Sequence, residues 1–283
     1  MASAALPLSI IDNTSETYKE VKESIFETHT DEIIIGLCGP IGTDIHFVAD
    51  ILDRILSDKY NYKCKVIRLS DLIRTYAKDK FVFDEHDTKF NNYQKLINGG
   101  NSLRQEYSNS ILAELAINEI AVQREVLKGG EEYESQRVCY IIDSLKNKEE
   151  LELFRLIYRD IFYFIGVYSS IDVRVSNLEN KDIKTYEVHQ LIDRDSGEEM
   201  NFGQNVTDTF TESDFFLRVE NTSKNAVEPK IERFLNLIFS SDITTPSTDE
   251  TAMYLAFAAA GNSACLSRQV GAAITDAEGE IFL

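Results

Sequence analysis

A glycine-rich turn between an apolar run and an amphipathic stretch is the first candidate for chemistry. Residues 33–37 are apolar and mostly β-branched, and apolar side chains recur at helical spacing from Phe47 to Leu56. A strand that delivers a glycine turn to a helix N-terminus aims backbone N–H groups and the helix dipole at one point, which suits a phosphate. The turn therefore predicts a nucleotide-binding loop, made of Gly39, Pro40, Ile41, Gly42, Thr43 and Asp44.

This turn departs from the phosphate-loop pattern G-x-x-x-x-G-K-[ST], in which the lysine reaches the terminal phosphates and the hydroxyl holds magnesium. In the register that starts at Gly39, Asp44 replaces the second glycine, Ile45 the lysine and His46 the hydroxyl residue. The loss of both groups predicts severely weakened phosphoryl transfer, and Asp44 is expected to repel a polyphosphate. Two interpretations stay open: a degenerate loop that binds a Mg-nucleotide, and a turn that only joins a strand to a helix.

Four charged residues elsewhere are candidates for the same site. Asp143 ends a buried apolar run, where an acid that organises magnesium would lie, although an ordinary helix cap before Ser144 explains it equally well. Arg104, Arg174 and Arg194 lie on polar segments, where a guanidinium group could bind a phosphate. Each arginine taken singly is more often a solvated surface charge.

The sequence contains no motif for a zinc site or for a serine esterase. No histidine has zinc-ligand spacing to a cysteine or to a glutamate two residues on, and G-x-S-x-G is absent. His189 and Asp193 could form a catalytic pair, but a lone histidine in a polar segment is usually solvated. The cysteines are widely spaced and are interpreted as reduced, mostly buried thiols: Cys38, Cys64, Cys139 and Cys265.

The elements that position these residues alternate between strand and helix. Buried strands are predicted at 33–37, 65–69, 138–143, 161–167 and 213–219, with helices between most of them. This alternation predicts an α/β fold with a parallel sheet and helices on both faces. Ser70 is a candidate helix cap, residues 84–101 are polar with Gly99-Gly100 near their end, and residues 172–212 fit a mobile lid or insertion.

Four parts are expected along the 283 residues. These are an amino-terminal arm at 1–30, a first domain at 31–240, which the resemblance described below implies to be P-loop kinase-like, a linker at 241–250 and the start of a second domain at 251–283. A helix at 250–262 and a hairpin cannot bury an independent core, so the second domain is expected to be incomplete.

The charge and hydropathy of the sequence argue against two classes of partner, nucleic acid and membranes. With 48 acidic and 29 basic residues, the net charge of −19 argues against general DNA binding and against an anionic membrane surface. No apolar run is long enough to span a bilayer, and no signal peptide is recognised at the start. We therefore expect a cytoplasmic protein without membrane contact.

Several stretches together resemble one protein family. From about residue 33 onward, the chain is similar to bacterial anti-phage deoxycytidylate/dCTP deaminases, with a P-loop kinase-like domain first and a zinc-dependent deaminase domain after it. The resemblance rests on the turn at 39–44, on 138–146 (VCYIIDSLK), 153–159, 164–168, 194–195, 203–210 and 213–216, and on 256–274 for the deaminase start.

The resemblance implies deamination of deoxycytidine nucleotides to deoxyuridine nucleotides, which would deplete dCTP during phage infection. It further implies a zinc ion in the intact family member, a homo-oligomer and, for some members, a small inhibitory RNA. The zinc chemistry uses the motifs H-x-E and P-C-x-x-C. Since the last histidine is His189 and the last proline Pro246, neither motif is present, and this chain alone is expected neither to hold zinc nor to deaminate.

Two alternatives belong to other classes. One is a catalytically inert module that senses a nucleotide or an RNA. The other is an active nucleoside monophosphate kinase, which the lid-like segment favours and Ile45 opposes.

Overall fold

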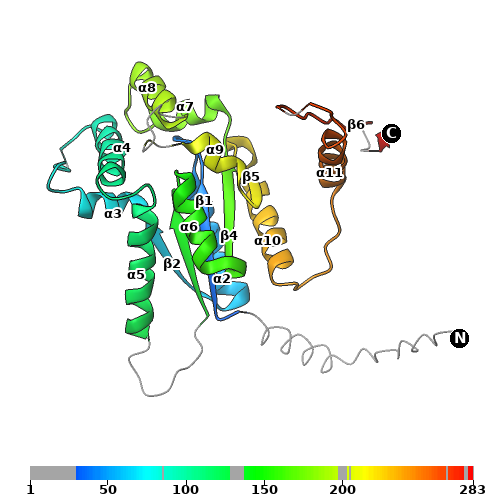
Figure 1. Cartoon of the computed structure of the whole chain (residues 1–283), viewed down its shortest axis with the longest axis horizontal. Helices are drawn as coiled ribbons and strands as arrows, with labels where there is room; N and C mark the ends of the chain where they lie inside the picture. The colour runs from blue at the N-terminus through cyan, green and yellow to red at the C-terminus, as the bar shows by residue number, and fades with distance from the viewer. Residues whose placement is uncertain are drawn as a thin grey trace, which may run out of the picture. The chain divides into compact units, whose positions relative to one another are not determined.

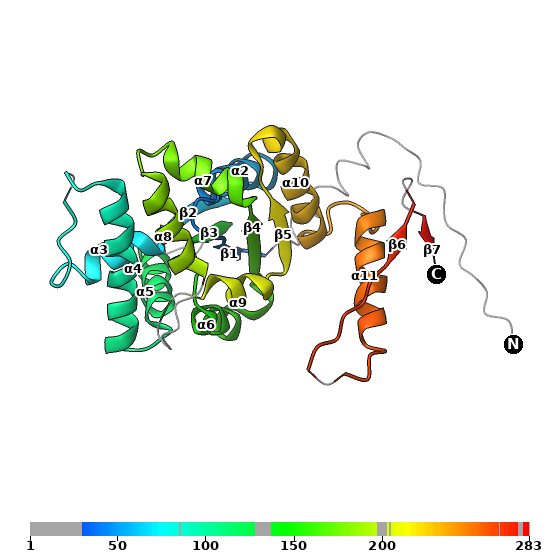
Figure 2. The same ribbon diagram turned by 90° about the horizontal axis from the view of Figure 1, so that it is seen from above.

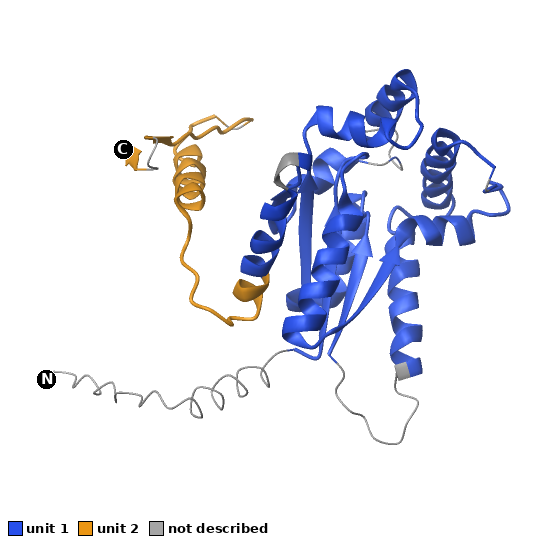
Figure 3. Ribbon diagram, turned by 180° about the vertical axis from the view of Figure 1, so that it is seen from behind, with its two compact units in different colours: residues 1–234 blue, residues 235–283 orange. Residues whose placement is uncertain are grey.

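A computed structural model describes residues 30–84, 86–127, 137–196, 203, 205–265, 267–276 and 280–282 of the chain. These residues fall into two compact units, which divide between Phe234 and Leu235 (Figure 3). The predicted arm at 1–30 lies, apart from its last residue, outside the described residues. The elements in chain order are β1 (Glu32–Cys38), α2 (Ile45–Tyr60), β2 (Lys63–Arg68), α3 (Leu69–Tyr76), α4 (Lys89–Glu106), α5 (Ile111–Leu127), β3 (Val138–Asp143), α6 (Lys148–Tyr158), η1 (Arg159–Ile161), β4 (Phe162–Tyr168), α7 (Ile171–Glu179), α8 (Thr185–Ser196), α9 (Val206–Thr211), β5 (Phe215–Arg218), η2 (Asn221–Ala226), α10 (Val227–Ile238), α11 (Thr248–Ala260), β6 (Ile274–Thr275) and β7 (Ile281–Phe282).

The first unit is built on a five-stranded parallel sheet in the order β2-β3-β1-β4-β5. The central strand β1 is buried along almost its whole length, as expected for a strand with neighbours on both sides and helices on both faces. Leu37 pairs with Asp143 of β3, and Cys38 pairs with Gly166 of β4. The glycine turn after β1 and the acid that ends β3 therefore lie at the same edge of the sheet, its carboxyl edge.

Helices cover both faces of this sheet (Figure 2). On one face, α5 and α6 pack on alternate strand residues such as Ile34, Tyr140 and Phe164, all fully buried. The opposite face carries α2 and the first part of α10 (Figure 2). The predicted α/β fold, a parallel sheet with helices on both faces, is confirmed.

A second hydrophobic cluster lies apart from the sheet. It joins α4, α7 and α8, which we call the helical arm, through buried side chains that include Leu178, Val188 and Leu191. Ile41 from the glycine turn belongs to this cluster and is 7% exposed. The turn after β1 is thus packed directly against the helical arm, whose α7 and α8 lie near the carboxyl edge (Figure 1).

Three local features differ from the sequence-based predictions. Helix α4 runs through Gly99-Gly100. A Cβ on Gly99 would lie 2.8 Å from Cγ2 of Ile73, so the glycine allows α3 to approach α4 closely. The described part of residues 172–212 is largely helical, in α7, α8 and α9, although its periodicity was too weak to show it. Ser70 does not cap α3, which begins one residue earlier with Arg68 at the cap position.

The second unit holds the last turn of α10, helix α11 and a short antiparallel pair, β6 with β7. A capping box between Ser247 and Glu250 starts α11 two residues before the predicted helix. Among the thiols that were predicted to be mostly buried, Cys38 and Cys139 are buried, Cys64 is half-buried and Cys265 is exposed. The hydrogen bond with Ser267 lowers the pKa of Cys265 to about 7. Whether this unit begins a deaminase domain stays a prediction. None of the described helices is both long and apolar enough to cross a membrane.

Candidate functional site

The glycine turn adopts a fixed shape through its own backbone. Gly42 has φ = +87°, a left-handed conformation that favours glycine, and a Cβ there would lie 2.7 Å from the carbonyl oxygen of Arg174. Thr43 N–H donates to the carbonyl of Pro40 at 3.0 Å, and Asn177 Nδ2 donates to the carbonyl of Gly42 at 2.9 Å. The turn therefore packs closely against α7 at Gly42, and any side chain at this position would clash with the backbone of Arg174.

The first turn of α2 presents N–H groups that its own cap does not satisfy. Asp44 holds the cap position, but its side chain accepts no hydrogen bond from the helix. Its carboxylate instead forms an ion pair with Lys224 Nζ at 2.6 Å. The predicted repulsion between Asp44 and an anion is therefore offset by a neighbouring cation, and a 16-residue helix directs its positive dipole end into the site.

His46, in the place of the magnesium-binding hydroxyl, contacts the acid at the end of β3. His46 Nδ1 lies 2.6 Å from Asp143 Oδ2, and Ser144 Oγ donates to Asp143 Oδ1 at 2.9 Å. Asp143 is 1% exposed, and the cap position of the following helix α6 is held by Asn147 and not by Asp143. Arg68 Nε adds a further cation 3.8 Å from this carboxylate.

These residues do not fit a protein-held magnesium ion. Mg²⁺ prefers oxygen ligands, whereas this position carries a histidine nitrogen that already pairs with the nearest carboxylate. Among the described residues, no group of three or more His, Cys, Asp or Glu side chains could hold a metal ion.

The contact between His46 and Asp143 makes the stability of the protein depend on pH. The hydrogen bond to Asp143 raises the pKa of His46, against the opposing effects of burial, Arg68 and Lys181. A raised pKa stabilises the folded state below the unfolded-state pKa of about 6.5, and this contribution is lost as the pH rises through the folded-state value. We expect His46→Gln to cost about 0.5–1 kcal/mol at pH 5.5 and less at pH 8.5, in urea unfolding at both pH values. A cost that grows with pH would contradict this linkage.

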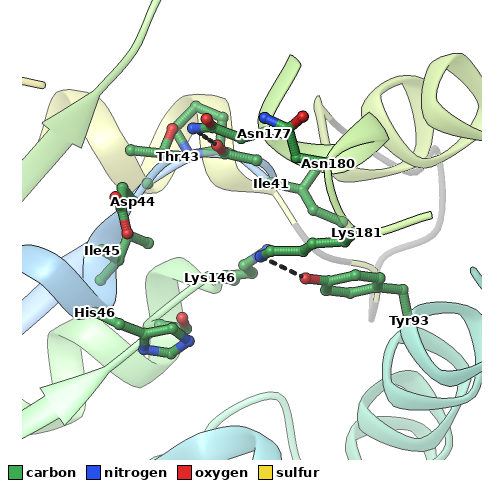
Figure 4. Close-up of a pocket in the computed structure, with 14 residues that line it drawn as sticks. Ile41, Thr43, Asp44, Ile45, His46, Tyr93, Lys146, Asn177, Asn180 and Lys181 are labelled. Carbon is green, nitrogen blue, oxygen red and sulfur yellow. Dashed lines mark hydrogen bonds between the residues drawn. The ribbon is translucent and has the colours of Figure 1, made fainter. Parts of the chain in front are cut away.

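Two adjoining cavities open beside the turn. The smaller, of about 270 Å³, is lined by residues 39–46 together with Tyr93, Ser144, Lys146, Asn177, Asn180 and Lys181. Figure 4 shows Lys146 and Lys181 reaching into the same space, with Lys181 Nζ 3.2 Å from the hydroxyl of Tyr93. Lys146 and Lys181 thus bring positive charge to the turn, where the sequence has lost the lysine of the phosphate-loop pattern.

The larger cavity, of about 460 Å³, shares several of these residues and has a mixed wall. Its apolar part comes from α3, α4 and α5, with Leu69, Ile73, Leu96, Ile97 and Leu112. Its polar part contains Arg74, Lys89, Arg104, Lys146 and Lys181, against the single acid Asp143. This volume lies within the range of small-molecule pockets, about 300–1,000 Å³, and the wall suits a ligand with one apolar and one anionic end.

The three arginines predicted as phosphate-binding candidates lie at different positions relative to the two cavities. Arg104 lines the larger cavity but is buried and bound to Glu150, with Nε 2.9 Å from Oε1, so it is no solvated surface charge. Arg174 lies behind the turn, where Nε donates to the carbonyl of Ile41 at 2.8 Å, and burial lowers its pKa. Arg194 Nη2 donates to Asn98 at 2.9 Å and does not line either cavity.

The sequence-based search missed the residues that complete the site. Lys146, Lys181, Tyr93 and Asp195 come from the loop after β3, the α7–α8 connection, α4 and α8. Asp195 is fully buried and accepts hydrogen bonds from Ile41 N–H and Lys146 Nζ. Within the described part of the chain, Thr43 Oγ1 and Arg174 Nη2 are buried without a hydrogen-bond partner. Two polar groups near the turn are therefore available to hydrogen-bond a ligand.

Comparisons with known proteins give a fold likeness and no family. No family model matches the chain, and no curated protein matches it. An uncharacterized protein from Eubacterium ventriosum and a shikimate kinase from Bacteroides thetaiotaomicron are similar in structure, each with a TM-score of 0.36. Their sequence identities are 12% and 13%, and each match covers 72% of this chain and 98% of the other. Similarity at this level identifies no activity.

Proposed function

We propose that the first unit binds a nucleotide and acts as a sensing or regulatory domain without transferring a phosphoryl group. The observation that carries this proposal is the concentration of Lys146, Lys181, Lys89 and Arg74 around two cavities that share lining residues, in a chain of net charge −19. An anion is the natural complement of such a wall, and the uncapped start of α2 adds N–H donors to it.

The two cavities suggest how a nucleotide would lie. Its phosphate would occupy the smaller cavity, near the turn and Lys181, and its nucleoside the larger cavity, against Leu69, Ile73 and Leu112. The kinase alternative is disfavoured because Ile45 is buried and His46 is engaged with Asp143. ADP formation above background that disappears in Asp143→Ala would restore the kinase alternative.

Lys181→Gln tests the proposal. Lys181 faces both cavities, and a charge-assisted hydrogen bond contributes about 1.5–3 kcal/mol, so we expect nucleotide affinity to fall about 10- to 100-fold. Lys184→Gln is the matched control, since Lys184 is exposed and lines neither cavity. Calorimetric titration with dCMP, dCTP and ATP measures both effects. Absence of binding by the wild type would overturn the proposal.

We propose further that this nucleotide-binding unit belongs to a deoxycytidine nucleotide deaminase of the anti-phage type. The support is the sequence resemblance from about residue 33 onward. The zinc ion, the homo-oligomer and the small inhibitory RNA are parts of the same proposal. The protein purified from its native host should then have a mass above 32.2 kDa and should deaminate dCTP or dCMP. A mass of 32.2 kDa with no deamination would overturn it.

A further inference from the structure

A buried carboxylate already occupies the anion-binding donors of the glycine turn. Asp195, in the last turn of α8, is fully buried. Its Oδ2 accepts the hydrogen bond of Ile41 N–H, and its Oδ1 pairs with Lys146 Nζ. A backbone N–H of a glycine turn and a lysine ammonium are the donors that would hold a phosphoryl oxygen.

The other contacts of Ile41 bind the same turn to the helical arm. Its carbonyl accepts from Arg174 Nε of α7 at 2.8 Å, and its side chain lies in the cluster formed with Leu178, Val188 and Leu191. Hence the N–H, the carbonyl and the side chain of one turn residue are all engaged by α7 and α8. Ile41 N–H is therefore in direct contact with the end of α8 through Asp195.

The lysine in this arrangement comes from outside the turn. Lys146 follows β3, and it lines both cavities while paired with Asp195. Its side chain is 15% exposed, so an incoming anion can reach it. Lys146 can therefore supply the positive charge that Ile45 cannot.

We propose that Asp195 is a built-in competitor for the anionic group of the ligand. A phosphoryl group of the bound molecule replaces the Asp195 carboxylate on Ile41 N–H and Lys146 Nζ, and the last turn of α8 is released from the turn. The binding of a phosphorylated ligand is thereby coupled to the position of the helical arm. This inference rests on the proposed nucleotide-binding function and assigns the phosphate-binding lysine to position 146.

Asp195→Asn removes the competing charge and keeps the size of the side chain. We expect the affinity for inorganic pyrophosphate to rise about tenfold, within the range of about 5–150-fold common for coupled sites. Asp193→Asn is the matched control, since Asp193 is an exposed acid on the same helix, and its affinity should equal that of the wild type. Titration calorimetry measures all three proteins.

The outcomes separate this inference from the proposed function. If the wild type binds pyrophosphate and Asp195→Asn binds it equally or more weakly, Asp195 only supports the turn and the competitor role is overturned. If none of the three proteins binds pyrophosphate, nucleotides or other phosphorylated probes, both proposals are overturned. Tighter binding by Asp195→Asn alone supports both.

A measurement on the wild type covers the case in which Asp195→Asn does not fold. Amide hydrogen exchange with and without saturating pyrophosphate reports on the release of the last turn of α8, at the end of Thr185–Ser196. We expect these amides to exchange faster when the ligand is bound, although ligands usually slow exchange. Slower or unchanged exchange in α8 would overturn the displacement.

Discussion

Replacement of Arg104 by methionine is expected to lower the free energy of unfolding by about 3–5 kcal/mol, because it leaves a buried charge without its partner. The side chains of Arg104 and Glu150 are 1% and 0% exposed, and Nη2 of Arg104 lies 2.8 Å from Oε1 of Glu150. Burial raises the pKa of Glu150, and Arg104 opposes that rise. Without the guanidinium group, the folded state is kept only if the Glu150 carboxylate takes up a proton, because a charged carboxylate without a partner is unfavourable in the protein interior.

This loss should depend on pH in a defined direction. A carboxyl with a raised folded-state pKa stabilises the protein below its unfolded pKa of about 4.3, and the contribution is lost as the pH rises through the folded value. The deficit of Arg104→Met should therefore be smaller at pH 4.5 than at pH 7.5. Urea unfolding at both pH values measures it.

An exposed ion pair provides the control for Arg104→Met. Arg218→Met removes a cation whose Nε lies 3.1 Å from Glu220 and whose side chain is 66% exposed, so we expect a cost below about 1 kcal/mol. Equal losses in the free energy of unfolding for the two variants would show that the buried Arg104–Glu150 pair stabilises the protein no more than an exposed pair. Because Arg104 also lines the larger cavity, its variants are measures of stability and not of ligand binding.

The fold was predictable because continuous apolar runs mark strands that are buried on both faces. Residues 138–143 were predicted as a strand and form β3 with the same limits. Helix α4 was not predicted, since residues 84–101 showed only a polar stretch with Gly99-Gly100 near its end, and no local pattern shows that the bare backbone of Gly99 packs against Ile73. Its start did carry a signal, because Thr88 accepts a hydrogen bond from Asn91 N at 3.2 Å, as a helix cap does.

The site was predictable only where it follows from the strand ends. The turn at 39–44 and Asp143 come together because parallel neighbouring strands end at one edge. Asp195 lies 154 positions from Ile41 and 49 from Lys146, and no local pattern encodes such contacts. Helix α8 did carry an apolar pattern at helical spacing, in Val188, Leu191 and Ile192, which are three and four residues apart and buried. The charged and polar residues around them made this pattern too weak to predict the helix.

Lys146→Met is expected to have two effects with different origins. It removes the ammonium group that pairs with the fully buried Asp195 carboxylate and leaves the hydrogen bond from Ile41 N–H, so the free energy of unfolding should fall by about 3–5 kcal/mol. It also removes the cation that we assign to the ligand phosphate, so pyrophosphate binding should be lost. Lys148→Met is the control, since Lys148 is an exposed lysine 3.4 Å from Glu212, and it should cost below about 1 kcal/mol.

The double variant Lys146→Met with Asp195→Asn separates these two effects. Removing both charges leaves neither stranded, so we expect a recovery of about 2 kcal/mol or more relative to Lys146→Met alone, a coupling typical of contacting residues. Pyrophosphate binding should not recover, because the lysine is still missing. Recovered stability without binding would show that Lys146 both neutralises Asp195 and binds the ligand. Additive losses of stability, or binding by the double variant, would contradict the assignment of the phosphate to Lys146.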